Sequence, residues 1–245
     1  MKRVAVFVYG VVSYLIFFGT FLYAMAFVGN LGVPKAIDGP LEGSFGTALI
    51  VNLVLLTIFA VQHSVMARPA FKRWWTTIIP EAAERSTYTL LSSLALILLF
   101  WLWRPMGGEV WTVTNPIGHA ILLGLFFFGW GLVLFSTLLI NHFDLFGLRQ
   151  VWLYLQGREY TPLPFATPIL YKYVRHPLYV GWFFAFWATP TMTITHLTFA
   201  IVTTAYILVA VRIEERDLVE ALPEYAAYSA RVPRFVPGTG GNPQG

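Results

Sequence analysis

The chain has 245 residues, of which 57% are hydrophobic and only 11% are charged. Soluble domains carry about 25% charged residues, so this composition excludes a soluble globular protein and predicts an integral membrane protein whose partner is the lipid bilayer. The net charge of +4 is too small to indicate a nucleic-acid partner. The absence of cysteine excludes disulfides, thiolate metal sites and cysteine nucleophiles.

Six apolar segments follow one another along the chain. A helix needs about 20 apolar residues to cross a bilayer; the third and fifth segments are shorter than that. Only a Thr-rich stretch separates the fifth from the sixth, so we expect these two to form a tight helical hairpin. The predicted fold is an all-α, polytopic membrane bundle of about six transmembrane helices. The predicted spans are Val4–Val28, Phe45–Val65, Tyr88–Trp103, Ile117–Ile140, Leu178–Thr193 and Thr195–Val211.

The loop charges predict the orientation. An even number of spans places both termini on one side, and of the 16 basic residues only Lys35 and Arg104 fall on the other. Because Lys and Arg concentrate in cytoplasmic loops, we expect both termini and the active site to be cytoplasmic, in a bacterial inner membrane. We expect one transmembrane domain over residues 1–237 and a flexible tail over 238–245, which is rich in Gly and Pro.

The most informative polar segment begins at Arg175 and His176, directly before Pro177 and an apolar run. A charged group beside hydrocarbon costs at least a few kcal/mol, and Pro suits the first turn of a helix. These residues therefore predict a helix N-terminus near the membrane surface, where backbone N–H groups favour anionic ligand groups. A snorkelling Arg–His pair that anchors the helix end is the alternative.

A second polar segment follows the sixth span, whose helix we expect to continue to Pro223. Glu214 continues the face that packs inward, whereas Glu215 and Arg216 are predicted to face water. The Glu214 carboxylate could pair with Arg175 or hold a cationic ligand group, or it could belong to a solvated helix end.

A third polar segment follows the fourth span and contains His142, Asp144 and Arg149. Three ionisable groups within eight residues are candidates for proton transfer or ligand binding. Alternatively, Asp144 caps a helix and His142 is an interface residue. The five His residues lack the spacing of a metal site, and the chain has no HExxH, Walker A, GxGxxG or GxSxG motif. We therefore expect no bound metal.

Three motifs near the C-terminus occur in a fixed order: RHPLYVG at 175–181, EERDL at 214–218, and Tyr225 followed by VPRFVP at 232–237. Together they resemble the isoprenylcysteine carboxyl methyltransferase family of integral membrane enzymes. The resemblance implies S-adenosylmethionine as cofactor, in a pocket closed by a cytoplasmic C-terminal helix and loops.

Two upstream segments, 62–69 and 139–152, resemble one branch of that superfamily, the methanethiol S-methyltransferases. That branch implies methylation of methanethiol, a small thiol, to dimethyl sulfide. The prenyl-protein enzymes have an Arg for the substrate carboxylate one turn before the Glu, where this chain has Ala210. A small neutral or thiol substrate therefore fits better than a prenylcysteine.

The resemblance also implies roles for individual residues. The helix N-terminus with His176 would hold the cofactor carboxylate, and Glu214 its ammonium or ribose. Tyr171 and Tyr179 would pack against the adenosine and the sulfonium. The expected cofactor-binding residues are Gln156, Leu163, Pro164, Phe165, Ala166, Tyr171, Arg175, His176, Pro177, Leu178, Tyr179 and Glu214.

For the thiol, His142 or Asp144 would accept the proton and Arg149 would stabilise the thiolate. Two other functions stay open from the sequence. One is methylation of a phospholipid headgroup at the same cofactor site, and the other is a non-enzymatic membrane protein of nitrogen-oxide metabolism.

Overall fold

The computed structural model describes residues 1–239. The chain divides into two compact units. Unit 1 comprises Met1–Val110, Asn141–Pro162 and Thr193–His196, and unit 2 comprises Trp111–Ile140, Leu163–Met192 and the chain from Leu197 onward. The predicted flexible tail, 238–245, falls outside the described residues except for its first two.

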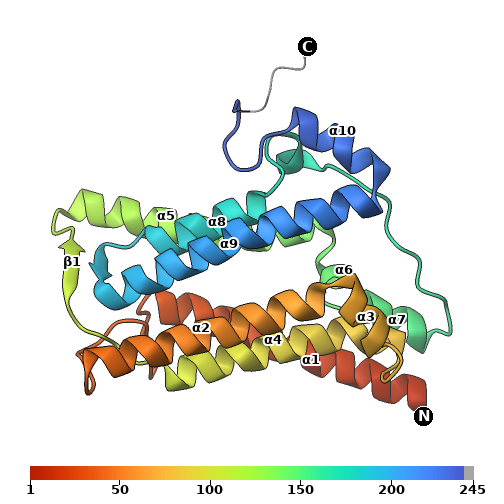
Figure 1. The fold of residues 1–245 in the computed structure, drawn as a ribbon, viewed down its shortest axis with the longest axis horizontal. Coiled ribbons are helices and arrows are strands. Elements are labelled where there is room, and N and C mark those ends of the chain that lie inside the picture. Colours follow the sequence, from red (N-terminus) through yellow and green to blue (C-terminus); the bar gives the residue numbers. More distant parts are fainter. Residues whose placement is uncertain (240–245) are drawn as a thin grey trace. The chain divides into compact units, whose positions relative to one another are not determined.

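Five helices within the described residues are long and apolar enough to cross a membrane (Figure 1). The chain is therefore a helical, multi-pass membrane protein, in agreement with the predicted fold class. The five helices are α1 (Lys2–Val28), α2 (Phe45–Ala67), α4 (Glu81–Leu102), α5 (Pro116–Ile140) and α9 (Ile194–Ala221).

The expected fifth span is a shorter helix, so the count of six full transmembrane helices is not reproduced. Helix α8 (Pro177–Trp187) has 11 residues, and at 1.5 Å per residue it covers about 16 Å of a hydrocarbon core of roughly 30 Å. The chain continues without helix to β2 (Thr191–Thr193), which pairs with β1 (Glu109–Thr112) before α5. The chain after α8 thus returns to the end of unit 2 at which α5 begins.

The non-helical residues after α8 are covered by protein. Ala188 is 6% exposed and Thr189 is 8% exposed. The Trp111 indole lies 3.4 Å from the Thr189 carbonyl, and the Val113 N–H donates to the Pro190 carbonyl at 2.9 Å. Irregular backbone at membrane depth is tolerated only where protein surrounds it, and these contacts meet that condition.

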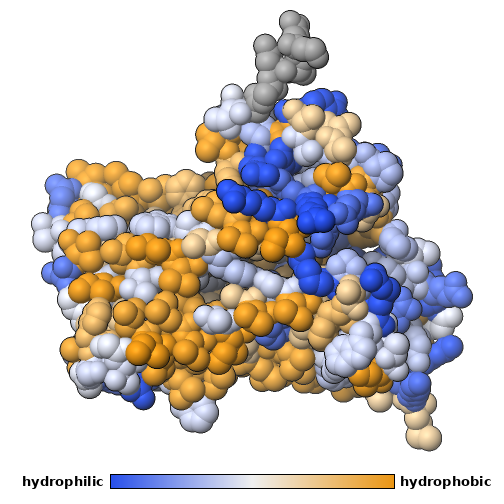
Figure 2. Space-filling model, in the orientation of Figure 1, coloured by the Kyte–Doolittle hydropathy of each residue, from blue (hydrophilic) through white to orange (hydrophobic). Residues whose placement is uncertain are grey.

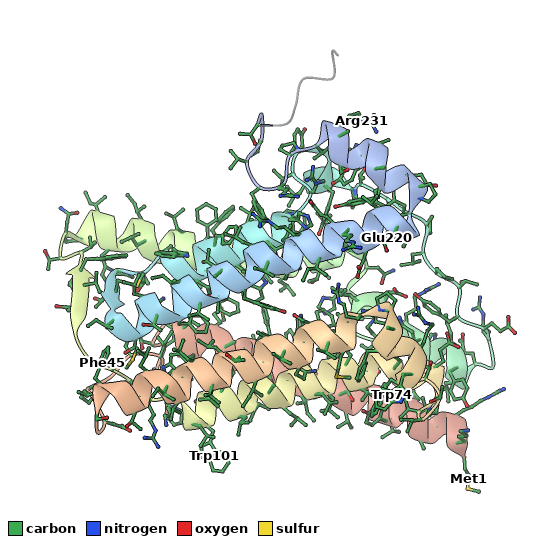
Figure 3. All side chains as sticks on the ribbon, viewed as in Figure 1. Met1, Phe45, Trp74, Trp101, Glu220 and Arg231 are labelled. Carbon is green, nitrogen blue, oxygen red and sulfur yellow. The ribbon has the colours of Figure 1, made fainter. Side chains whose placement is uncertain are left out.

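Unit 1 is built around α4, which packs against both α1 and α2. This helix starts at Glu81, seven residues before the predicted third span, because its first turns carry charged residues that a search for apolar runs passes over. Acidic side chains in the first turn stabilise a helix by their interaction with the helix dipole. Trp101 projects away from the C-terminal end of α4 (Figure 3) and is 72% exposed. The unit also holds α3 (Pro69–Trp75), α6 (His142–Leu145) and α7 (Leu148–Leu155).

In unit 2, α8 packs against α5 and α9. Trp182 and Trp130 make an edge contact between α8 and α5, with ring centroids 5.1 Å apart. Phe186 of α8 meets Phe199 of α9 at 5.0 Å, and the Trp187 indole donates to Thr204 at 2.9 Å. Later residues of α8 thus meet earlier residues of α9, the antiparallel order that the predicted hairpin requires.

The polar end of unit 2 lies beyond the apolar part of α9. The unit also contains the 3₁₀ helix η1 (Ile169–Lys172) and α10 (Pro223–Arg231). Hydrophilic side chains gather around α10 and the C-terminal end of α9, whereas hydrophobic side chains cover the long helices (Figure 2). The polar residues of the three C-terminal motifs lie at this end.

Candidate active site

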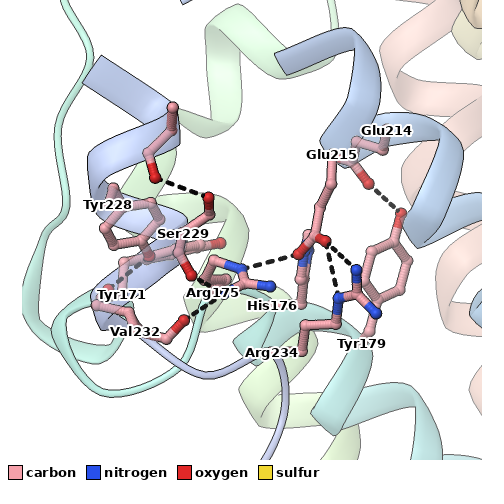
Figure 4. Close-up of polar contacts among 11 residues, drawn as sticks. Tyr171, Arg175, His176, Tyr179, Glu214, Glu215, Tyr228, Ser229, Val232 and Arg234 are labelled. Atoms are coloured by element: carbon pink, nitrogen blue, oxygen red, sulfur yellow. Dashed lines mark hydrogen bonds and ion pairs between the residues drawn. The ribbon is translucent and has the colours of Figure 1, made fainter. Parts of the chain in front are cut away.

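The three C-terminal motifs meet at the carboxylate of Glu215 (Figure 4). One oxygen, Oε1, lies 2.8 Å from Nε of Arg175 and 2.9 Å from Nε2 of His176. The other, Oε2, accepts two hydrogen bonds from the Arg234 guanidinium, both at 2.7 Å. We call these four residues the Glu215 cluster. It sits in low-dielectric surroundings, since His176 is 6% exposed and Glu215 8%.

Backbone hydrogen bonds join the same segments. The N–H groups of Arg175 and His176 donate to the carbonyls of Pro233 and Arg234, at 2.8 and 3.1 Å. The Arg175 guanidinium also donates to the carbonyls of Ser229, at 2.6 Å, and Val232. The C-terminal segment is therefore fixed to the start of α8 by both main-chain and side-chain contacts.

The prediction that Glu215 faces water is wrong. Neighbouring residues on a helix point about 100° apart, and the returning C-terminal segment covers the side of α9 that carries Glu215. Arg175 pairs with this residue and not with Glu214. Glu214 instead accepts a hydrogen bond from the Tyr179 hydroxyl at 2.8 Å. Since Arg175 and His176 both bind Glu215, they are not a pair that snorkels to the membrane surface.

Helix α8 begins with His176 at the N-cap and Pro177 at the first helical position. No side chain caps this helix start within residues 1–239. The first N–H groups of a helix lack partners within the helix and favour anions. The start of α8, including Leu178, is thus available for an anionic ligand group beside Glu214.

Aromatic rings line the next part of the unit. Phe165 belongs to the exposed stretch Leu163, Pro164, Phe165 and Ala166, and its ring lies 5.5 Å from that of Tyr228 and 6.1 Å from that of Tyr225. The Tyr228 hydroxyl donates to the Tyr171 carbonyl at 2.6 Å. Burial raises the pKa of Tyr228 to about 12. Burial, with the nearby Glu214 carboxylate, also raises the pKa of Tyr171, so both phenols stay protonated.

Gln156 lies in a different unit from the other expected cofactor residues. It caps the C-terminal end of α7 in unit 1 and is exposed. The other expected cofactor residues all belong to unit 2.

The expected thiol-activating residues lie at α6 and α7 of unit 1. The Asp144 carboxylate binds Nη1 of Arg149 at 2.9 Å and the Tyr160 hydroxyl at 3.2 Å. Asn141, and not Asp144, caps α6, because its side chain accepts from the Asp144 N–H at 3.1 Å. Arg149 also donates to the Thr161 carbonyl at 2.9 Å. Asp144 and Arg149 therefore act as a pair.

His142 has a different environment. It is 5% exposed, and its Nε2 lies 2.8 Å from the Tyr14 hydroxyl. Burial lowers the pKa of His142, so its imidazole is neutral at physiological pH. A neutral imidazole has one unprotonated nitrogen, which is the form that accepts a proton.

Sequence reasoning missed Glu215, Arg234, Tyr225 and Tyr228 as site residues, although the signal was present in the mixture of aromatic and basic residues after α9. Within residues 1–239, no group of three or more His, Cys, Asp or Glu side chains is placed to hold a metal ion.

Comparison with known proteins identifies the family. The model of the isoprenylcysteine carboxyl methyltransferase (ICMT) family matches residues 162–220. The methanethiol S-methyltransferase of Crocosphaera subtropica is 55% identical over 98% of this chain and 94% of its own length. That of Mycobacterium tuberculosis is 52% identical over 97% and 98%, respectively. Nurim of Bos taurus is 30% identical over 84% of this chain and 86% of its own length.

No solved structure matches the chain. The family match covers α8 and most of α9, which carry the first two motifs, and the near-full-length relatives extend the similarity to both units. The chain therefore belongs to the isoprenylcysteine carboxyl methyltransferase family, in the branch of the methanethiol S-methyltransferases.

Proposed function

We propose that this chain transfers a methyl group from S-adenosylmethionine to methanethiol and produces dimethyl sulfide. The observation that carries the proposal is the 52–55% identity, over nearly the whole chain, to relatives named methanethiol S-methyltransferase. The side chains of unit 2 support it, because their chemistry matches the groups of this cofactor.

The fit to the cofactor follows from its charges. S-adenosylmethionine carries a carboxylate, an ammonium group, an adenosine and an electrophilic methyl group on a sulfonium. The start of α8 suits the carboxylate. The Glu214 oxygen that does not bind Tyr179 suits the ammonium or ribose hydroxyls. The rings of Tyr171 and Tyr179 suit the sulfonium by cation–π attraction, and the backbone of 163–166 suits the adenosine.

The contact between His176 and Glu215 refines the role of the imidazole. Nε2 of His176 faces the Glu215 carboxylate, so only Nδ1 remains for a ligand. With the proton of a neutral ring on Nε2, Nδ1 is an acceptor, and it donates to an anion only when the ring is charged. We therefore assign the cofactor carboxylate mainly to the N–H groups at the start of α8. His176 acts as the residue that holds this helix start against α9.

We assign the thiol proton to His142. A thiol attacks as its thiolate, so the S–H bond would break and its proton would pass to the unprotonated nitrogen of the imidazole. The thiolate electron pair would form the new S–C bond while the bond between the methyl group and the donor sulfur breaks, with S-adenosylhomocysteine as the leaving group. Asp144 and Arg149 hold each other, and the guanidinium supplies positive charge for the anion. The assignment rests on the chemistry of these side chains.

Replacing His142 with Ala is expected to lower kcat/KM by about 10²-fold, the usual contribution of a general base. In the unchanged protein, activity is expected to fall as the pH drops through the lowered pKa of His142, because the imidazole then becomes protonated, and the variant should lose this limb of the pH profile. Asp144→Asn tests the alternative base. If both variants keep kcat/KM and the pH profile, the assignment is wrong.

We further propose that residues 1–237 act as one transmembrane domain in a bacterial inner membrane, with both termini and the three C-terminal motifs in the cytoplasm. The support is the distribution of Lys and Arg, of which only Lys35 and Arg104 fall in segments on the other side.

The function is tested with the purified protein in detergent. Headspace gas chromatography should detect dimethyl sulfide after methanethiol and S-adenosylmethionine are added, and calorimetry should detect binding of S-adenosylhomocysteine. Binding without dimethyl sulfide, together with methylation of added phospholipid, would indicate a lipid substrate. Absence of both binding and product would overturn the proposal.

Glu214→Gln is expected to weaken S-adenosylhomocysteine binding about tenfold, since it removes a charge that pairs with the ligand ammonium. The matched control is Glu220→Gln on the same helix. The Glu220 side chain is 66% exposed and pairs with Arg216. Equal affinities for the two variants would remove Glu214 from the cofactor site.

A further inference from the structure

Tyr225 carries a buried hydroxyl without a partner. Its residue is 3% exposed, and the hydroxyl has no hydrogen-bond partner among residues 1–239. Buried polar groups in proteins are nearly always paired, and leaving one unpaired costs about 1–3 kcal/mol. Tyr228, three residues further along α10, shows the usual situation, because its hydroxyl donates to the Tyr171 carbonyl.

The neighbours of Tyr225 do not use its hydroxyl. Both oxygens of Glu215 are taken by Arg175, His176 and Arg234. Burial, and next the Glu215 carboxylate, raise the pKa of Tyr225, so the phenol stays protonated and remains a donor. The site therefore holds a hydrogen-bond donor whose acceptor residues 1–239 do not supply.

The surroundings of this hydroxyl indicate the class of ligand. The rings of Phe165 and Tyr228 lie 6.1 and 5.6 Å from that of Tyr225, both in edge-to-face orientation. Three aromatic rings beside an unpaired donor suit a flat heterocycle that carries acceptor nitrogens. Phe165 belongs to the stretch that we assign to the adenosine.

We infer that the Tyr225 hydroxyl donates a hydrogen bond to the adenosine of the methyl donor, and that Tyr225 is a positioning residue for the cofactor. The inference rests on the proposed function and extends the site to α10. It gives the covering helix a direct role in ligand binding, in addition to its contacts with Arg175.

The test compares two substitutions that each remove one hydroxyl from the same helix. Without ligand, Tyr225→Phe should keep or raise the Tm, because it removes an unpaired buried hydroxyl, whereas Tyr228→Phe should lower the Tm by leaving the Tyr171 carbonyl unpaired. With S-adenosylhomocysteine, Tyr225→Phe should raise the Kd by about 3- to 10-fold, the net effect of one hydrogen bond. In the assay, it should raise the KM for S-adenosylmethionine and leave kcat at saturating cofactor unchanged.

A lower Tm for Tyr225→Phe with unchanged Kd would overturn the inference, because the hydroxyl would then have a structural role. An unchanged Tm with an unchanged Kd would overturn it equally. If the unsubstituted protein fails to bind S-adenosylhomocysteine, the proposed function itself fails, and this result is distinct from a failure of Tyr225 alone.

Discussion

Glu215→Ala is expected to be the most damaging single substitution in unit 2, with a much lower Tm and no detectable binding of S-adenosylhomocysteine. The carboxylate neutralises the guanidinium of Arg175, whose side chain is only 10% exposed, and binds the buried His176. Removing one partner of a buried ion pair costs about 3–5 kcal/mol, because the remaining charge loses its compensation. The two guanidiniums would also repel each other. Thermal unfolding in detergent and calorimetry measure the two effects.

The control for this prediction is Glu220→Ala in the same helix. Glu220 lies near the C-terminal end of α9 (Figure 3) and forms an exposed pair with Arg216. Such pairs contribute about 0–1 kcal/mol. Glu215→Gln distinguishes the effect of the negative charge from the effect of the side-chain shape, since the amide has the same shape and keeps one acceptor oxygen. A Glu215→Ala protein with the Tm and affinity of the control would show that the cluster does not hold the site together.

Gly181→Leu is expected to separate α8 from α5 and to prevent assembly of unit 2. A Cβ atom at Gly181 would lie 2.8 Å from the carbonyl oxygen of Gly129 and 2.9 Å from the backbone nitrogen of Val133. A Cβ at Gly129 would lie 2.5 Å from the backbone nitrogen of Ala185. The obstructing atoms are backbone, which cannot rotate aside, and close helix approach through small residues is a main source of packing in membranes.

The expected readouts are a lower yield of folded protein on size-exclusion chromatography and a lower Tm, with Gly181→Ala intermediate. Gly124→Ala on α5 is the matched control, because a Cβ there meets nothing within 4 Å, and Ala favours helix over Gly. A Gly181→Leu protein as stable as this control would show that α5 and α8 do not pack as described.

The sequence predicts the membrane class and the long helices well, because apolar runs of about 20 residues have few other uses. The prediction of helix ends fails where the apolar run and the helix have different lengths. The predicted fifth span continued to Thr193, but the helix ends at Trp187 and Thr191–Thr193 form β2. The start of α4 was missed for the opposite reason, since its charged first turns interrupt the apolar pattern.

The candidate site is predictable only in part. The motif resemblance located α8, α9 and the C-terminal segment, and all three meet in unit 2. Helical periodicity alone assigned Glu215 wrongly, because it assumes one inward face. The direction from which α10 returns decides that Glu215 is also covered, and this tertiary feature leaves no trace in the spacing of α9.

Gly181 has a packing role that the motif alone does not reveal. In the sequence it is the last residue of RHPLYVG and carries no chemistry. In unit 2 it is the contact point with Gly129 of α5. The motif therefore combines residues that we propose to contact the cofactor with one residue that packs against a neighbouring helix.

The attachment of the C-terminal segment to the start of α8 also determines when the Glu215 cluster is completed during synthesis of the chain. Ribosomes make Arg175 and His176 before Arg234, so a growing chain that has just reached Glu215 still lacks Arg234, one of the three side chains that bind this carboxylate. The Glu215 cluster is completed only once residue 234 has been added to the growing chain. A polypeptide interrupted before Arg234 would therefore lack part of this cluster.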